Sequence, residues 1–104
     1  GNGLGQNHKE ILINEQRGLI GFPAYNYKNN DLSYNVYSYK NGFKQKLKTS
    51  FEKSSKMWNY DYAEELRGLY IGDYLYIAST DVGVQVFDMN TFENLGEMLY
   101  SKIK

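Results

Sequence analysis

Short runs in which apolar and polar residues alternate, separated by turn residues, make up most of the chain. Alternation with a period of two places successive side chains on opposite faces of a strand, and clusters of Gly, Asn and Asp are typical of turns. The pattern predicts eight short strands, at residues 10–14, 18–25, 34–39, 43–51, 66–71, 74–79, 82–88 and 95–100.

The clearest turn signal is Asn41-Gly42, which stands between Tyr39 and Phe43. A type I′ turn requires positive φ at both central residues, and Asn and Gly tolerate that conformation best. The sequence therefore predicts a type I′ hairpin at this point.

The second half of the chain repeats the plan of the first at a spacing of roughly fifty residues. Residues 36–39 align with residues 84–87, and Gly21-Phe22 aligns with Ile77-Ala78. Four strands whose inner members are apolar on both faces are typical of a propeller blade. We expect an all-β fold of two four-stranded antiparallel blades of a β-propeller, with a first blade at 1–52, an inter-blade connection at 53–65 and a second blade at 66–104.

The expected strand at residues 43–51 has the composition of an edge strand. Strict alternation would place Phe43, Gln45, Leu47, Thr49 and Phe51 on one face and three lysines on the other. Lysines along an edge keep its unpaired backbone groups in water and discourage pairing with another sheet. We therefore interpret this strand as the outer edge of the first blade.

Three segments carry a family resemblance. Residues 66–79 have the sequence Leu-Arg-Gly-Leu-Tyr-Ile-Gly-Asp-Tyr-Leu-Tyr-Ile-Ala-Ser, residues 8–13 begin with His-Lys, and residues 86–92 run from Val86 to Phe92. They resemble the signature strand pair, a His-Lys strand and the exit hairpin of a bacterial, secreted β-propeller family distantly related to WD repeats. The resemblance implies an extracellular or cell-surface location, an uncharacterised function, and a segment that supplies the carboxy-terminal blades.

Charge and composition exclude several partners. Lys and Arg together number 12, as do Asp and Glu, so there is no net positive charge to attract a nucleic acid. No apolar run approaches the ~20 residues that cross a bilayer. Cysteine is absent, which removes disulfides and thiolate sites. We expect no nucleic-acid partner and no membrane span in this segment.

The reactive side chains argue against catalysis. His8 is the only histidine, so the chain cannot form a two-histidine metal site, and we interpret His8 as a hydrogen-bond partner at a strand start. The adjacent Glu64 and Glu65 would point to opposite sides of an extended segment, whereas glycoside hydrolysis needs facing carboxyls. Ser79-Thr80-Asp81 resembles the start of a sialidase Asp-box, but the rest of the box is missing, and we expect Asp81 to close a turn through its own side chain. The sequence predicts no catalytic residue, no metal and no cofactor.

The candidate binding residues are Trp58, Tyr60 and Tyr62, which alternate with Asn59 and Asp61 before the second blade. Flat rings beside hydrogen-bonding groups suit sugars or peptide side chains. The same rings are also suited to covering the junction between two blades, and we favour this packing role.

The function we expect is a non-enzymatic scaffold for protein or carbohydrate binding in a secreted or cell-surface protein. Two alternatives stay open: part of a propeller hydrolase whose active site other blades complete, or blades that only close the ring. Two blades alone leave apolar faces bare, so we also expect this fragment to form a homo-oligomer.

Overall fold

The computed structural model describes residues 11–29, 31–51 and 66–102. Its eight strands form two four-stranded antiparallel sheets, and within each sheet every strand pairs with its neighbours in sequence. The first sheet contains β1 (Leu12–Asn14), β2 (Leu19–Asn26), β3 (Asp31–Ser38) and β4 (Lys44–Thr49). The second contains β5 (Leu66–Ile71), β6 (Tyr74–Ser79), β7 (Gly83–Asp88) and β8 (Asn94–Leu99), followed by the 3-10 helix η2 (Tyr100–Lys102). The predicted fold class, all-β with two four-stranded antiparallel units, is confirmed.

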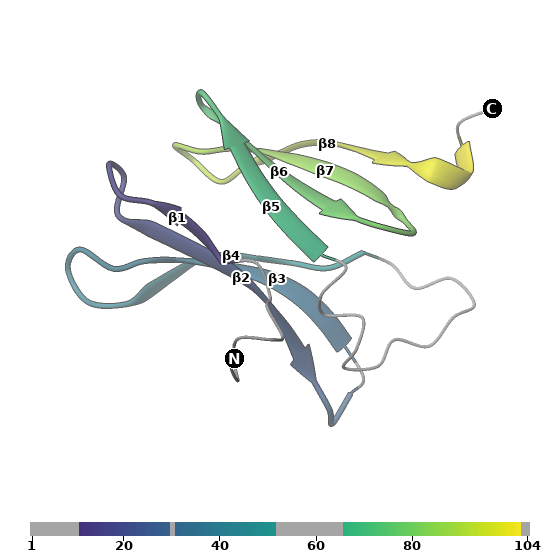
Figure 1. Ribbon diagram of the computed structural model, residues 1–104, viewed down its shortest axis with the longest axis horizontal. Helices are drawn as coiled ribbons and strands as arrows, with labels where there is room; N and C mark the ends of the chain where they lie inside the picture. The colour runs from purple at the N-terminus through teal and green to yellow at the C-terminus, as the bar shows by residue number, and fades with distance from the viewer. Residues whose placement is uncertain (1–10, 30, 52–65, 103–104) are drawn as a thin grey trace.

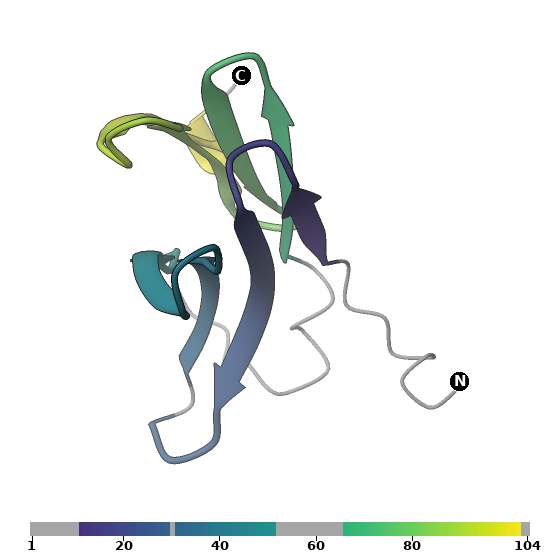
Figure 2. The ribbon, with the colours of Figure 1, turned by 90° about the vertical axis from the view of Figure 1, so that its left-hand side faces the viewer.

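The two sheets are stacked, with the first sheet below the second in Figure 1. In Figure 2 the first strands, β1 and β5, lie on one side of the stack, and the last strands, β4 and β8, lie toward the other. Among the described residues, no helix has the length and apolar character needed to cross a membrane. The buried core comprises Leu19, Leu32, Tyr34, Val36, Phe51, Leu66, Leu75, Ile77, Phe87 and Met89.

Each sheet has an inner face, which meets the other sheet, and an outer face. On β3, Tyr34 and Val36 are buried and belong to the inner face. Asn35 alternates with them and therefore lies on the outer face. On β6, Leu75 and Ile77 are likewise buried on the inner face, and the residues between them lie on the outer face.

The two sheets share one hydrogen-bonding register. Gly21 pairs with Val36 in the first sheet, and Tyr76 pairs with Val86 in the second. In both sheets a β-bulge follows the valine, where the register of the last strand shifts. Gly21 is therefore equivalent to Tyr76, and Val36 is equivalent to Val86.

This register corrects the repeat alignment derived from the sequence. The sequence aligned Gly21 with Ile77, one residue too far along the chain, and residues 36–39 with 84–87, two residues too early. A shift of one residue exchanges the two faces of a strand, so the alignment matters for any comparison of surfaces. The repeat itself is present.

The strand bounds agree best in the second half. β5 and β6 have the predicted ends, β7 begins one residue later than predicted, and both ends of β8 lie one residue earlier than predicted. In the first half, β3 begins at Asp31 instead of residue 34, because Leu32 and Ser33 continue the ladder with β2. The predicted connection at 53–65 lies outside the described residues.

The β3–β4 hairpin forms, but its turn is not type I′. Ser38 pairs with Lys44, and residues 39–43 form the connection. Gly42 has a φ of 86°, whereas Phe92 is the only non-glycine residue with positive φ in the described part of the chain. Asn41 therefore lacks the positive φ that a type I′ turn requires, and the predicted turn type is wrong.

The bulge also corrects the predicted faces of β4. Leu47 lies opposite Val36 and Gln45 lies opposite Tyr37, so Lys46 is an extra residue between them. An extra residue reverses the alternation. Leu47 consequently shares the inner face, whereas Gln45 shares the outer face with Tyr37. The single apolar face expected for this strand is wrong.

Candidate functional site

A groove of about 490 Å³ crosses the outer face of the first sheet. Strand β3 lies between β2 and β4 in this sheet, and all three strands and the β2–β3 turn contribute lining residues. Its lining consists of Phe22, Ala24, Tyr25, Asn26, Tyr27, Lys28, Asp31, Ser33, Asn35, Tyr37 and Lys48.

The floor of the groove is polar although it is buried. Ser33 and Asn35 are only 4% and 6% exposed. Asn35 Nδ2 donates to Ser33 Oγ at 3.1 Å, and Gln45 Nε2 donates to Asn35 Oδ1 at 3.2 Å. These bonds hold the Asn35 amide in one orientation, because both of its polar atoms have a fixed partner.

Aromatic rings form one side of the groove. Phe22 and Tyr37 stack with a centroid distance of 5.9 Å and an interplanar angle of 4°, and Phe43 meets Tyr37 edge to face at 6.2 Å. Beside the groove, Ile20 joins these three rings around an apolar recess of about 190 Å³. Phe43 is 76% exposed, so the recess opens to solvent.

The same face of the second sheet is already covered by protein. By the shared register, Phe22 is equivalent to Ile77, Asn35 to Gln85 and Tyr37 to Phe87. Ile77, Gln85 and Phe87 are all buried against the first sheet. The open groove is therefore the counterpart of a surface that serves as a sheet-to-sheet interface in the second sheet.

Gln85 shows what an amide does at this position. Its Oε1 accepts a hydrogen bond from Thr49 Oγ1 at 2.6 Å, and its Nε2 donates to the Ser50 carbonyl oxygen at 3.2 Å. The same Nε2 donates to Glu97 Oε2 at 3.0 Å within the second sheet. Gln85 thus links the second sheet to β4 and to the backbone that follows it.

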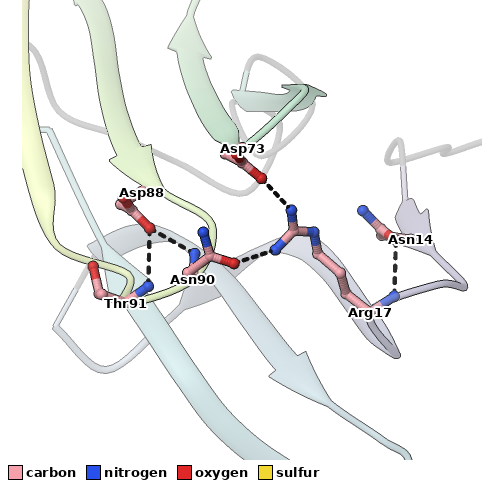
Figure 3. Close-up of polar contacts among 6 residues, drawn as sticks. All are labelled: Asn14, Arg17, Asp73, Asp88, Asn90 and Thr91. Carbon is pink, nitrogen blue, oxygen red and sulfur yellow. Dashed lines mark hydrogen bonds and ion pairs between the residues drawn. The ribbon is translucent and has the colours of Figure 1, made fainter.

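A second polar link joins the turns at one end of the stack (Figure 3). Arg17 Nη2 lies 2.7 Å from Asp73 Oδ1, and its Nη1 donates to Asn90 Oδ1 at 2.7 Å. The turn that carries Asn90 is held by Asp88, whose Oδ1 accepts from the backbone amides of Asn90 and Thr91. A guanidinium from the first sheet therefore bridges two turns of the second.

Charge is divided between the sheets. Residues 11–29 and 31–51 carry six basic and two acidic side chains, whereas residues 66–102 carry two basic and five acidic ones. The even balance of 12 and 12 over the chain conceals this division. The first sheet is basic, the second is acidic, and the Arg17–Asp73 pair is one contact between the two.

The outer face of the second sheet is open and apolar. Leu69, Ile71, Tyr74 and Met98 lie on this face and are between 47% and 60% exposed. Apolar surface that clusters on one face of a sheet marks an interaction site more often than scattered residues do. We call these four residues the second-sheet patch.

The residues singled out from the sequence have different outcomes. Trp58, Tyr60 and Tyr62 lie outside the described residues, as does His8, and their interpretation stays a prediction. The role predicted for Asp81 is wrong, because Ser79 Oγ closes that turn by accepting hydrogen bonds from the amides of residues 81 and 82. In the described ranges, no group of three or more His, Cys, Asp and Glu is placed to hold a metal ion.

Sequence reasoning missed the groove. Its floor residues, Ser33 and Asn35, alternate with apolar residues as solvent-facing positions do, so the pattern gives no sign that they are buried. The signal that identifies Asn35 is its equivalence to Gln85, which emerges only from the correct register.

Comparison with known proteins gave one match. A profile of the β-propeller domain family matches residues 3–92, which include strands β1 to β7. No curated protein and no solved structure matched the chain.

Proposed function

The chain belongs to the β-propeller domain family, and from this premise we propose that it is a non-enzymatic segment that binds protein through the groove on its first sheet. One observation carries the proposal. Asn35 occupies in the first sheet the position at which Gln85 of the second sheet contacts a neighbouring sheet. Because the groove lies on the face that packs against a neighbouring sheet in the other repeat, it is suited to binding a protein surface.

The chemistry of the groove supports protein over carbohydrate. The Asn35 amide is equivalent to one that binds a backbone carbonyl oxygen, and every protein segment offers such an oxygen. The recess between Phe22, Tyr37 and Phe43 suits an apolar side chain. Aromatic residues at the centre of a surface with polar residues at its rim are typical of protein interfaces.

The lining also supports a binding role over catalysis. Asp31 is the one carboxylate among the described lining residues, whereas glycoside hydrolysis uses a pair of them. The other polar groups are amides, hydroxyls and amines. The resemblance to secreted propellers supports placing this binding function at the cell surface or outside the cell.

A displayed peptide library tests the proposal. The chain is immobilised at low density, so that copies do not meet, and phage that display random peptides are selected on it. Selected peptides should lose at least tenfold in affinity on Phe43→Asp, which alters the recess. They should keep their affinity on Leu69→Asp, the matched control on the second-sheet patch. Both positions are exposed in the structure, so both variants should fold.

Three outcomes would contradict the proposal. Peptides that bind the Phe43→Asp variant as well as the unaltered chain would place the protein-binding surface elsewhere. A glycan-array signal that Phe43→Asp abolishes, without peptide enrichment, would assign the groove to carbohydrate. Turnover of chromogenic glycosides or esters by the purified chain would make the segment an enzyme.

A further inference from the structure

We infer that the protein which fills the first-sheet groove is a second copy of this chain, seated there by the second-sheet patch. This inference rests on the proposed function and names its partner. Three independent observations support it: the equivalence of the faces, their apolar surfaces and the distribution of charge.

The equivalence of the faces shows that the two outer faces, one on each sheet, are the kinds of face that pack against each other inside the chain. The outer face of the second sheet corresponds to the inner face of the first, and the outer face of the first corresponds to the inner face of the second. The two inner faces already pack against each other. A second copy could stack on the first in the way that the second sheet stacks on the first sheet within one chain. This arrangement would bring together the outer face of the second sheet and the outer face of the first.

Both open faces carry apolar surface that such a contact would bury. The outer face of the first sheet presents Phe43 at the recess and Ile13, which pairs with Ile20 on the neighbouring strand, at 76% and 51% exposure. The second-sheet patch presents four large apolar side chains, including Ile71 and Met98. Removing exposed apolar area from water is the main driving force for association.

Charge favours the same pairing. The open face of the first sheet belongs to the basic half, and the patch belongs to the acidic half. Lys40 is equivalent to Asn90, because Ser38 and Asp88 occupy matched positions two residues earlier. Within one chain, Arg17 on the β1–β2 turn of the first sheet contacts Asn90 of the second sheet. The equivalent contact between copies joins the β5–β6 turn of one copy, which carries Asp73, to Lys40 of the next copy. This contact joins an acid to a base.

A head-to-tail contact of this kind does not end with two chains. Each added copy presents a fresh open face, so the assembly either closes into a ring or continues to grow. Propellers close with about four to eight sheets. Because the described residues of each copy supply two sheets, the expected closed assembly contains about two to four chains.

Two blocked variants test the arrangement. Variant one carries Ile13→Asp and Phe43→Asp, which place carboxylates on the first-sheet face. Variant two carries Ile71→Asp and Met98→Asp, which do the same to the second-sheet patch. The matched control carries Leu95→Asp and Tyr100→Asp, two exposed positions that belong neither to the second-sheet patch nor to the lining of the groove and the recess. Circular dichroism establishes that each variant folds, and light scattering on a size-exclusion column gives its mass.

The unaltered chain and the control should form one closed assembly of about two to four copies, and its midpoint concentration should rise with salt. Each blocked variant alone should be a monomer. Their equimolar mixture should form a dimer with one copy of each and nothing larger, because one intact face of each kind remains.

Other results overturn the inference. A monomeric unaltered chain at micromolar concentration would do so, as would a variant that pairs with itself, since that contact would join like faces. If the mixture stays monomeric while library peptides still bind the groove, the partner is a different protein and the proposed function stands. If the mixture stays monomeric and no peptide binds, both the partner and the proposed function are wrong.

Discussion

The ring of Tyr34 fills the space that a side chain at Gly68 would need. Tyr34 lies on β3 of the first sheet and Gly68 on β5 of the second, and a Cβ atom at Gly68 would lie 2.5 Å from Tyr34 Oη. Gly21, on the strand next to β3, leaves room for the same ring: a Cβ there would lie 2.9 Å from Tyr34 Cε1. Tyr34 is fully buried, so the two glycines allow the sheets to close around it.

Replacing Gly68 with alanine should therefore destabilise the chain. The added methyl group overpacks a filled core, which costs about 1 to 3 kcal/mol in the free energy of unfolding. Urea unfolding measures the difference. Gly96→Ala is the control, because nothing lies within 4 Å of a Cβ at that position, and it should change stability by less than about 0.5 kcal/mol. If the two variants unfold at the same urea concentration, Tyr34 does not occupy this space.

Replacing Gly42 with alanine tests conformation without crowding. A Cβ at Gly42 would meet no atom within 4 Å, yet φ is 86° there. The cost should be about 1 kcal/mol, because alanine is strained at positive φ. Gly42→Asn should cost less, since Asn tolerates this region better. A thermal melt compares the midpoints, and equal midpoints for the unaltered chain and the alanine variant would exclude a positive φ at this residue.

Gln85→Leu removes the amide that links the sheets. Ser50 and Glu97 would each lose a hydrogen-bond partner, and the Thr49 hydroxyl would lose its acceptor. The cost should be about 0.5 to 1.5 kcal/mol, the net contribution of a hydrogen bond, because Thr49 is only half-buried and Ser50 and Glu97 are exposed enough to bond to water instead. Thr49→Val should cost less, and the two changes should be non-additive in a double-mutant cycle because they remove one shared contact. Strict additivity in urea unfolding would argue against the Thr49–Gln85 bond.

Arg17→Ala should have a smaller effect than Gln85→Leu. The Arg17–Asp73 pair lies at the surface, where the two side chains are 29% and 65% exposed. Pairs in such positions contribute about 0 to 1 kcal/mol, and salt screens them. The difference between the unaltered chain and the variant should shrink in 1 M NaCl, a concentration at which the Debye length is about 3 Å. A loss that is large and independent of salt would mean that Arg17 acts through packing.

The second half of the fold was easier to predict than the first. Gly72-Asp73 separates two apolar runs so sharply that both ends of β5 and β6 follow from the sequence. In the first half, the polar run ahead of Leu32 and Ser33 has the composition of a turn, yet these residues pair with β2. Pairing with a neighbouring strand decided their conformation, and local composition carries no information about that neighbour.

The candidate site could not be found from the sequence for a related reason. Lys46 is one extra residue in β4, and nothing in an alternating run distinguishes an extra residue from a regular one. Without the bulge, Gln45 is assigned to the wrong face and its bond to Asn35 cannot be foreseen. The sequence instead pointed to Trp58, Tyr60 and Tyr62 as binding residues, because these aromatic residues stand together in the chain. The groove gathers its residues from three strands, so no single segment reveals it.

The matching bulges in the two sheets also bear on fibril growth. A bulge leaves one residue unpaired and increases the local twist of its strand, which spoils the flat template that a cross-β ladder needs. In both sheets the bulge lies in the last strand, β4 or β8, and the lysines of β4 add charge along that edge. When copies are prevented from stacking, concentrated solutions of the chain should therefore resist amyloid formation from either of these edges.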